Sequence, residues 1–160
     1  MSSLIVGAAL FICCAYVGFG ICDLYKRRSA FFDALIEYLD SLERGISYAK
    51  TPLPKLTEDF AADKKGELFA LLRKLAGDIR SGQKTEFKSP IFSAYERRRV
   101  VEMLDSLGKY DTDTQLTELR RYRALFAPTR EIAVKKYATT GKLAAKLGVL
   151  VGIAVMLALA

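Results

Sequence analysis

The chain has an apolar stretch near each end and a charged region between them. Leu4 to Cys22 comprises 19 residues without a charge, and Leu147 to Ala160 comprises 14 more. A helix rises about 1.5 Å per residue, so crossing a hydrocarbon core of roughly 30 Å takes about 20 residues. The pattern therefore predicts two membrane-spanning helices that hold one polar domain between them.

Each apolar stretch has an alternative interpretation. The first would be a cleaved signal peptide if basic residues preceded it, but Lys26-Arg27-Arg28 follows it instead. The second reaches 18 residues only when extended back to Leu143, and it then includes Lys146. A long lysine stem can carry its charge to the membrane interface, although a run this short also suits a buried core helix. We favour a retained span at both ends.

Basic residues next to both spans predict the orientation. Lys26, Arg27 and Arg28 follow the first span, and Lys135, Lys136, Lys142 and Lys146 lie before or within the start of the second. Basic residues near span ends stay in the cytoplasm. We therefore expect a multi-pass protein of the cell membrane, with transmembrane helices at residues 1–25 and 143–160. Residues 26–142 then form a cytoplasmic helical domain.

The polar region opens with a helical pattern that continues the first span. Apolar residues recur at alternating spacings of three and four, which is typical of a helix with one stripe facing a partner. The stripe comprises Phe32, Leu35, Leu39, Leu42, Ile46 and Ala49. No helix-breaking residue separates Cys22 from Ser29, so the span and this segment are expected to form one helix.

Prolines and glycines divide the next part of the chain. Pro52 and Pro54 stop the first helix, and Thr51 is a candidate cap for a helix from Leu53 to Asp63. Its inward residues are expected to be Leu53, Leu56 and Phe60. Another helix is expected from Glu67 to Ser81, with Gly82 as its C-terminal residue. The apolar face of that helix comprises Leu68, Leu71, Leu72, Leu75 and Ile79.

Two further helices are expected before the second span. Ser89-Pro90 predicts a helix start, and Gly108 ends a segment whose apolar face comprises Val100, Val101, Leu104 and Leu107. Asp111 or Thr112 then caps a last long helix. Its stripe comprises Leu116, Leu119, Tyr122 or Arg123, and Phe126. Pro128 lies inside this pattern and is expected to kink or split the helix.

These elements define the fold class. The middle region has roughly 120 residues, enough for one compact domain. It shows no strand-like alternation of useful length. We therefore predict an all-α protein, in which an antiparallel helical bundle of five or six helices lies between two terminal transmembrane helices.

The net charge of +7 changes the picture only slightly. A basic domain of this kind could bind nucleic acid, which remains an alternative function. The positive charge nevertheless gathers near the predicted spans, where anionic lipid attracts each basic residue by about 1 kcal/mol. Arg97-Arg98-Arg99 is either an anion site or a solvated face, and we favour the latter. Membrane lipid is the expected partner, and nucleic acid is not.

The residue types limit the chemistry. The chain contains no histidine, which removes histidine bases, Ser-His-Asp arrangements and histidine-ligated metals. Cys13, Cys14 and Cys22 all lie in the first apolar stretch, so the polar region has no cysteine zinc site. Asp111 and Asp113 lack a third oxygen-rich cluster nearby. We expect no enzyme, cofactor, metal or small-molecule substrate; the alternative is a membrane-tethered enzyme that works without histidine.

Small residues recur every fourth position in the second apolar stretch. Ala144, Gly148 and Gly152 follow this spacing, and the last two form a GxxxG motif. Such ridges let helix backbones approach closely in lipid. They are candidate helix-packing residues, facing either the first span or another subunit, although glycine and alanine are also common in spans by chance.

Two segments are more specific than helical periodicity demands. One combines E-x-x-I-x-Y with T-P-L-P, carried by Glu43, Ile46, Tyr48 and Thr51 to Pro54. The other is L-G-x-x-D-x-x-x-Q, carried by Leu107, Gly108, Asp111 and Gln115. With a span at each end and this length, the chain resembles the stage III sporulation protein AB family of endospore-forming bacteria. The resemblance covers the whole layout, but only these blocks are sharp.

The resemblance implies a function. The family is similar to the cytoplasmic helical domain of the type II secretion platform protein. It implies a membrane-anchored scaffold in the channel between mother cell and forespore, located in the mother-cell membrane. Other channel subunits and a cytoplasmic ATPase are the implied partners, and the implied role is assembly rather than catalysis. Pro128 departs from the unbroken charged helix expected in relatives, which puts the straightness of the last helix in doubt.

The two blocks also supply the candidate partner-binding residues. These are Glu43, Tyr48, Pro52, Leu53, Pro54, Leu107, Gly108, Asp111 and Gln115. Thr51 to Pro54 is expected to form a rigid turn at the end of the first long helix, and Gly108 to Asp111 a second tight turn. A hydrogen bond between Glu43 and Gln115 would join them. The alternative is that all of these residues only stabilise the fold.

Overall fold

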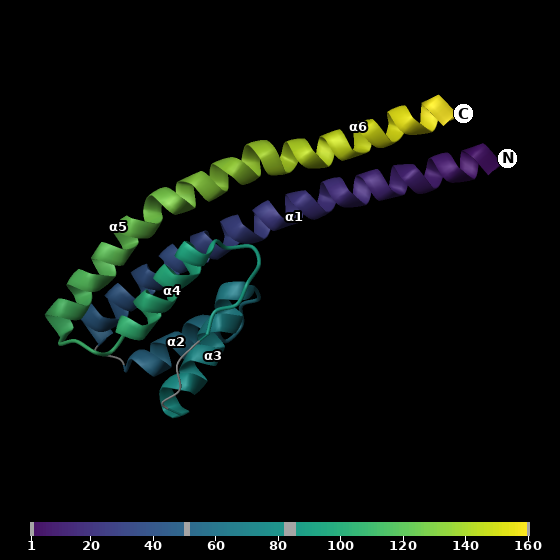
Figure 1. Ribbon diagram of the computed structural model, residues 1–160. Helices are drawn as coiled ribbons and strands as arrows, with labels where there is room; N and C mark the ends of the chain where they lie inside the picture. Colours follow the sequence, from purple (N-terminus) through teal and green to yellow (C-terminus); the bar gives the residue numbers. More distant parts are fainter. Residues whose placement is uncertain (1, 50–51, 82–85, 160) are drawn as a thin grey trace. The chain divides into compact units, whose positions relative to one another are not determined.

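The computed structural model describes residues 2–49, 52–81 and 86–159, and in these ranges it confirms an all-α protein without strands (Figure 1). Two five-residue π-helical turns, η1 and η2, interrupt the α-helices. The elements are α1 (Ser2–Arg44), η1 (Gly45–Ala49), α2 (Leu53–Ala61), α3 (Glu67–Ser81), α4 (Ala94–Ser106), α5 (Thr112–Lys136), η2 (Tyr137–Gly141) and α6 (Lys142–Leu159).

The chain forms two compact units. The first, here called the hairpin unit, comprises Met1–Ser29 with Glu131–Ala160, and the second, the helical unit, comprises Ala30–Arg130. Both α1 and α5 contribute to each unit. As predicted, no break separates the first apolar stretch from the helical segment after it, because α1 is continuous from Ser2 to Arg44.

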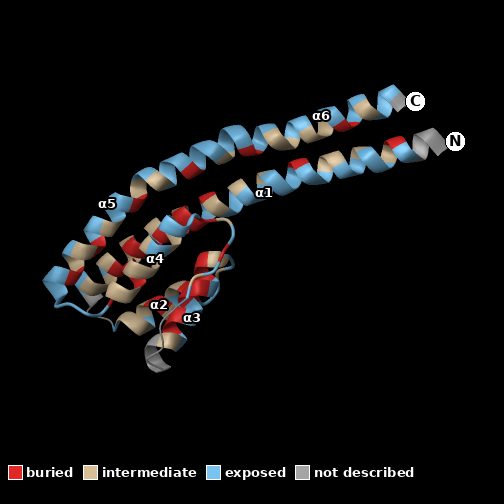
Figure 2. Cartoon of the chain, viewed as in Figure 1, coloured by how far each residue is buried: buried red, intermediate tan, exposed pale blue. Residues whose placement is uncertain are grey.

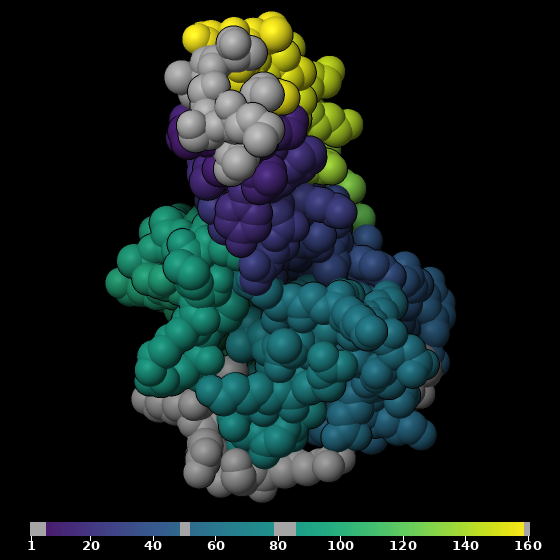
Figure 3. Space-filling view, turned by 90° about the vertical axis from the view of Figure 1, so that its right-hand side faces the viewer, coloured from purple at the N-terminus to yellow at the C-terminus, as the bar shows by residue number. Residues whose placement is uncertain are grey.

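The hairpin unit consists of two apolar helices packed against each other. The N-terminal part of α1 lies along α6 (Figures 1 and 3). Most of its described residues are exposed, as the pale blue ribbon of Figure 2 shows. Two long helices enter this unit. In each of them, only 11% of the most apolar 18-residue window is buried. A soluble protein would bury such residues, so these helices could span a membrane.

The helical unit is built around the C-terminal part of α1. Phe32, Leu35, Leu39 and Leu42 of the predicted stripe are at most 1% exposed. Burying a side chain of this size contributes about 1.5–3 kcal/mol. The buried face is wider than the predicted stripe, because it also contains Phe31, Ala34 and Tyr38. This helix is therefore surrounded on more than one side within the unit.

Helix α2 differs from the prediction in its buried face. It ends at Ala61 rather than Asp63, and the residues it buries are Thr57 and Ala61. The three residues expected to face inward, Leu53, Leu56 and Phe60, are only half-buried. The Tyr38 hydroxyl lies 2.9 Å from Thr57 Oγ1, so a hydrogen bond turns the polar threonine toward the core. Thr51, the predicted cap, lies outside the described residues.

Helix α3 has the predicted bounds and pairs with α2 (Figure 3). Leu68, Leu71, Leu72 and Leu75 are buried, as the periodicity predicted. The side chain of Ile79 and the whole of Gly82 lie outside what the structure describes. Phe60 of α2 contacts Phe69 of α3, with ring centroids 5.7 Å apart.

Helix α4 starts later than predicted. Ser93, not Ser89, is the N-cap: its side chain accepts a bond from the Glu96 N–H, and the Glu96 side chain accepts one from the Ser93 N–H. Such a reciprocal capping box satisfies two backbone donors at once. Ser89 instead donates to Glu67 at 2.9 Å. Helix α4 ends at Ser106, and Gly108 follows it with φ of +78°.

Pro128 does not split the last long helix. Helix α5 continues from Thr112 to Lys136 with Pro128 inside it. Leu119 and Phe126 are buried as predicted, and Tyr122 rather than Arg123 completes the stripe because Tyr122 is half-buried and Arg123 is exposed. The chain then passes through η2 into α6.

Candidate partner-binding surface

A polar depression of about 300 Å³ lies where α1 ends and α5 begins. It brings together two of the predicted residues, Glu43 and Tyr48, with charged residues from both helices. Its lining comprises Asp40, Glu43, Arg44, Ser47, Tyr48, Arg120 and Arg123. Acidic side chains come from α1 and two of the three arginines from α5, so the depression is built by the pairing of two helices far apart in sequence.

Ion pairs fix the register of these two helices. Arg120 Nε lies 2.7 Å from Glu43 Oε1, and Arg123 Nε lies 2.9 Å from Asp40 Oδ1. Further along, Arg130 Nε lies 2.5 Å from Asp33 Oδ1. Along these three ion pairs the residue numbers rise on α1 as they fall on α5, so the two helices are antiparallel. Exposed pairs contribute little each, but together they specify one alignment.

The π turn η1 displays Tyr48 at the rim of this depression. Tyr48 is 87% exposed, more than any other large apolar or aromatic residue in the described chain. Gly45 opens the turn, and a Cβ added there would lie 2.6 Å from Leu56 Cδ1. The missing side chain therefore lets α2 pack closely beside the turn. Isolated π turns are frequent at functional sites.

The Pro52–Pro54 segment begins α2. Pro52 occupies the N-cap position with φ −57° and ψ 134°, and it makes no side-chain hydrogen bond there. Pro54 falls in the first helical turn, where its missing N–H is tolerated. Pro52 is exposed, and Leu53 and Pro54 are half-buried. None of the three lines the depression, so the structure separates them from Glu43 and Tyr48.

The second block forms the turn between α4 and α5. Leu107 is buried, and Gly108 adopts the left-handed conformation that favours glycine. Asp111 caps α5 by accepting the Thr114 N–H at 3.3 Å. Hydrogen bonds from Thr114 lower the pKa of Asp111. The buried Gln115 accepts the Gly108 N–H at 3.0 Å, so this block holds the turn together from within.

The expected bond between Glu43 and Gln115 is not formed. Glu43 binds Arg120 instead, and Gln115 binds the backbone of Gly108. Gln115 and Arg120 lie between one and two turns apart on α5, so the two blocks occupy the same end of the helical unit without a direct bond. The sequence pattern did not predict that Arg44, Arg120 and Arg123 share a surface, because the depression forms only where α5 aligns with α1.

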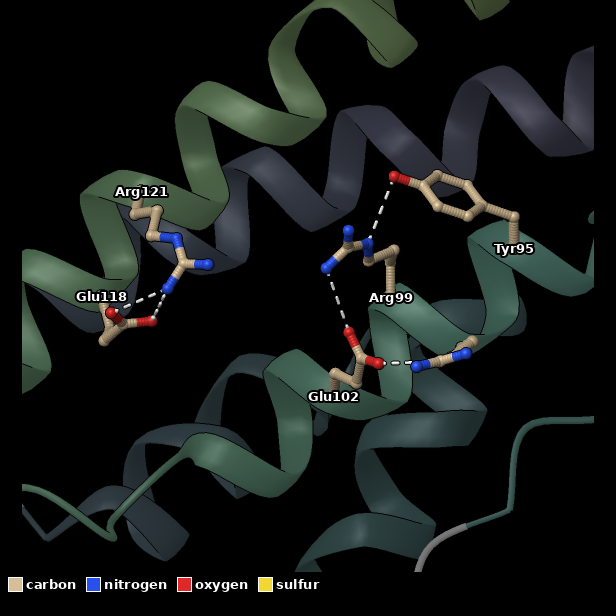
Figure 4. Close-up of polar contacts among 6 residues, drawn as sticks. Tyr95, Arg99, Glu102, Glu118 and Arg121 are labelled. Carbon is tan, nitrogen blue, oxygen red and sulfur yellow. Dashed lines mark hydrogen bonds and ion pairs between the residues drawn. The ribbon is translucent and has the colours of Figure 1, made fainter.

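The three consecutive arginines of α4 are engaged with their neighbours. Arg97 donates to the Ser89 carbonyl at 2.8 Å, and Arg98 pairs with Glu102 at 2.8 Å. Arg99 contacts Tyr95 and Glu102, as Figure 4 shows. The hydrogen bond from Arg98 keeps the pKa of Glu102 below its ordinary value. This arrangement fits a solvated charged face better than a free anion site.

The predicted small residues of α6 lie against α1 within the hairpin unit. A Cβ added to Gly148 would lie 2.8 Å from the Cys14 carbonyl oxygen and 3.0 Å from Gly18 Cα. A Cβ added to Gly152 would lie 3.2 Å from the Phe11 carbonyl oxygen. Gly18, which lies outside the predicted set of small residues, faces the Ala144 carbonyl in the same way. The GxxxG face therefore packs against the first apolar helix of the same chain.

Among the residues that the structure describes, no group of three or more Cys, Asp or Glu side chains could hold a metal ion. The acidic residues of the depression face arginines instead. What the depression offers chemically is charge and hydrogen-bond donors.

Fold and surface together define a class of protein. It is an all-helical protein in which two apolar helices that could span a membrane accompany a polar helical unit with a charged, tyrosine-bearing end. The family model described as stage III sporulation protein AB matches residues 3–160. The chain therefore belongs to the stage III sporulation protein AB family, as its two sequence blocks predicted. No curated protein and no solved structure shows a significant match.

Proposed function

We propose that this protein is a membrane-anchored structural component of the channel between mother cell and forespore. In this proposal the hairpin unit spans the mother-cell membrane, and the helical unit lies in the mother-cell cytoplasm. There it serves as a scaffold for other channel subunits and for a cytoplasmic ATPase. The role is assembly rather than catalysis.

The observation that carries the proposal is the combination of family and architecture. Family membership supports a role in stage III of sporulation. The outward-facing apolar side chains of the hairpin unit support anchoring, because such a surface is stable in lipid and unfavourable in water. Basic residues on the flanks, including Lys26 and Lys142, support a cytoplasmic location for the helical unit.

A deletion strain tests the proposed role. We expect loss of late forespore gene expression, measured with a forespore-specific fluorescent reporter, and its restoration by the wild-type gene. A second arm uses Leu150→Lys, since Leu150 is 61% exposed in the apolar part of α6. A lysine at a span centre raises the free energy of insertion by roughly 3 kcal/mol, so α6 of this variant should insert poorly and the variant should fail to complement.

A matched variant and a binding assay complete the test. Leu150→Phe keeps the surface apolar and should complement fully. Pull-down from detergent extracts of sporulating cells should recover the ATPase with wild-type protein. A deletion strain that sporulates normally, or an extract in which the ATPase never accompanies the protein, would contradict the scaffold role.

A further inference from the structure

The depression at the end of α1 contains more positive charge than its internal pairs use. Arg123 is committed to Asp40 through two nitrogens, at 2.9 Å and 3.4 Å. Arg120 contacts Glu43 through Nε alone, which leaves its two terminal nitrogens without a partner among the described residues. Arg44 lines the depression and is exposed, and in the described part of the chain it makes no ion pair or hydrogen bond.

Tyr48 adds a second donor and an aromatic surface to these arginines. The π turn holds its ring 87% exposed beside Ser47, which is also exposed. Burying such a ring is favourable, and the structure leaves it in solvent. Tyrosine and arginine are enriched among the residues that dominate protein–protein binding energy.

The size and charge of the depression define what it can hold. A volume of about 300 Å³ suits one or two side chains rather than a large cofactor. Guanidinium groups present parallel N–H donors that match the two oxygens of a carboxylate. The unpaired donors come from Arg44, Arg120 and the Tyr48 hydroxyl, so the ligand must supply acceptors and negative charge.

We propose that this depression binds an acidic segment of a partner protein. A glutamate or aspartate side chain of that segment lies between Arg44 and the terminal nitrogens of Arg120, and Tyr48 covers it from one side. This inference rests on the proposed scaffold function for the statement that the partner is a protein. It deepens that function by naming the surface and the chemistry of the segment it receives.

Fluorescence anisotropy with a fluorescein-labelled hexaglutamate peptide tests the site. The full-length protein in non-ionic detergent is used at low ionic strength, and a hexaglutamine peptide is the neutral control. Arg44→Ala and Arg120→Ala should each weaken binding about fivefold, the ratio that one lost contact of about 1 kcal/mol gives. Tyr48→Ala should weaken it at least twofold, by loss of one neutral hydrogen bond.

Arg121→Ala is the matched control. Arg121 adjoins Arg120 in sequence, and the two have similar side-chain exposure, 68% and 65%, but Arg121 pairs with Glu118 and does not line the depression (Figure 4). Its replacement removes the same charge and should change affinity by less than about twofold, the range expected of screened exposed charges. Circular dichroism of each variant checks that the helices remain folded.

Three results would overturn the proposal. The first is that hexaglutamate binds no better than hexaglutamine, and the second is that Arg121→Ala weakens binding as much as Arg44→Ala. The third is that a single-stranded DNA oligonucleotide displaces the peptide at lower concentration in an Arg44-dependent way, which would identify a nucleic-acid site. Because the assay needs no sporulating cell, its failure leaves the channel role intact, and a failed deletion test leaves peptide binding intact.

Discussion

At the residue scale, a buried chain of two hydrogen bonds determines how α2 packs in the helical unit. The Tyr38 hydroxyl donates to Thr57 Oγ1 at 2.9 Å, and Thr57 donates in turn to the Leu53 carbonyl at 2.9 Å. Tyr38 and Thr57 are fully buried. Burial raises the pKa of the Tyr38 hydroxyl well above its ordinary value, and the bond with Thr57 offsets only part of this. A buried polar pair of this kind selects one packing arrangement.

Replacing Tyr38 with phenylalanine isolates the contribution of this bond. Tyr38→Phe keeps the ring contact with Phe60, whose centroid lies 5.2 Å away, and Thr57 keeps its bond to Leu53. The free energy of unfolding should fall by about 1 kcal/mol. Tyr95→Phe is the control, since Tyr95 is exposed and should change stability by less than about 0.5 kcal/mol. Chemical denaturation followed by circular dichroism measures both; equal effects would contradict a stabilising role for the buried hydroxyl.

The same tyrosine should make stability fall in alkali. The folded protein keeps the Tyr38 proton above pH 10, where the unfolded chain loses it, so ionisation favours unfolding. The contribution is complete below about pH 10 and by pH 11 has decreased by about 1.4 kcal/mol. Denaturation at pH 8 and pH 11 should therefore show the wild type losing its advantage over Tyr38→Phe. A constant difference between the two proteins would mean that Tyr38 ionises normally in the fold.

At the element scale, the sequence predicted long helices better than their starts. Helices α1 and α3 follow from an apolar stripe and from the prolines and glycines around it. The predicted start of α4 was wrong because two segments, Ser89-Pro90 and Ser93 with Glu96, have the signature of a helix start. Only the second forms a reciprocal capping box. The inward turn of Thr57 depends on Tyr38, 19 residues away, which no local pattern contains.

The candidate surface was predictable only in part, for the same reason. Glu43 and Tyr48 could be singled out because they lie in one of the two sequence blocks that carry the family resemblance. Two of the three arginines beside them come from α5, and Arg120 lies 77 residues beyond Glu43 in the sequence. Periodicity gives the faces of two helices but not their relative register. The register is set by several weak pairs acting together.

Close approach of α1 and α6 in the hairpin unit gives a prediction for glycine substitutions. Gly148→Ala would place a Cβ against backbone atoms of Cys14 and Gly18, whereas a Cβ at Gly20 meets nothing within 4 Å. Gly148→Ala should therefore push the helices apart and destabilise the pair by about 1–3 kcal/mol. Gly20→Ala is the matched control and should be close to neutral. Unfolding of the full-length protein in mixed SDS and non-ionic detergent micelles measures the difference, and equal midpoints would contradict the tight interface.

At the scale of the whole molecule, the surroundings of the hairpin unit, lipid or water, distinguish two interpretations of it. Its outward-facing apolar side chains lie in lipid if the helices span a membrane, and they are wet if the protein is soluble. Cys13 is exposed on this surface, whereas Lys65 is exposed in the helical unit between α2 and α3. The three native cysteines all belong to the apolar stretch, so one added cysteine distinguishes the two units.

Labelling with a membrane-impermeant maleimide gives the corresponding prediction. In intact cells the wild type and Lys65→Cys should both remain unlabelled. When the membrane is made permeable to the reagent but is not dissolved, only Lys65→Cys should react, because lipid continues to shield the native cysteines. After denaturation in SDS, both proteins should react. Labelling of the wild type before denaturation would show that at least one of Cys13, Cys14 and Cys22 is in water, and this result would contradict burial of the apolar stretch in lipid. Labelling of Lys65→Cys in intact cells would place the helical unit outside, where a cytoplasmic ATPase could not reach the arginines at the end of α1.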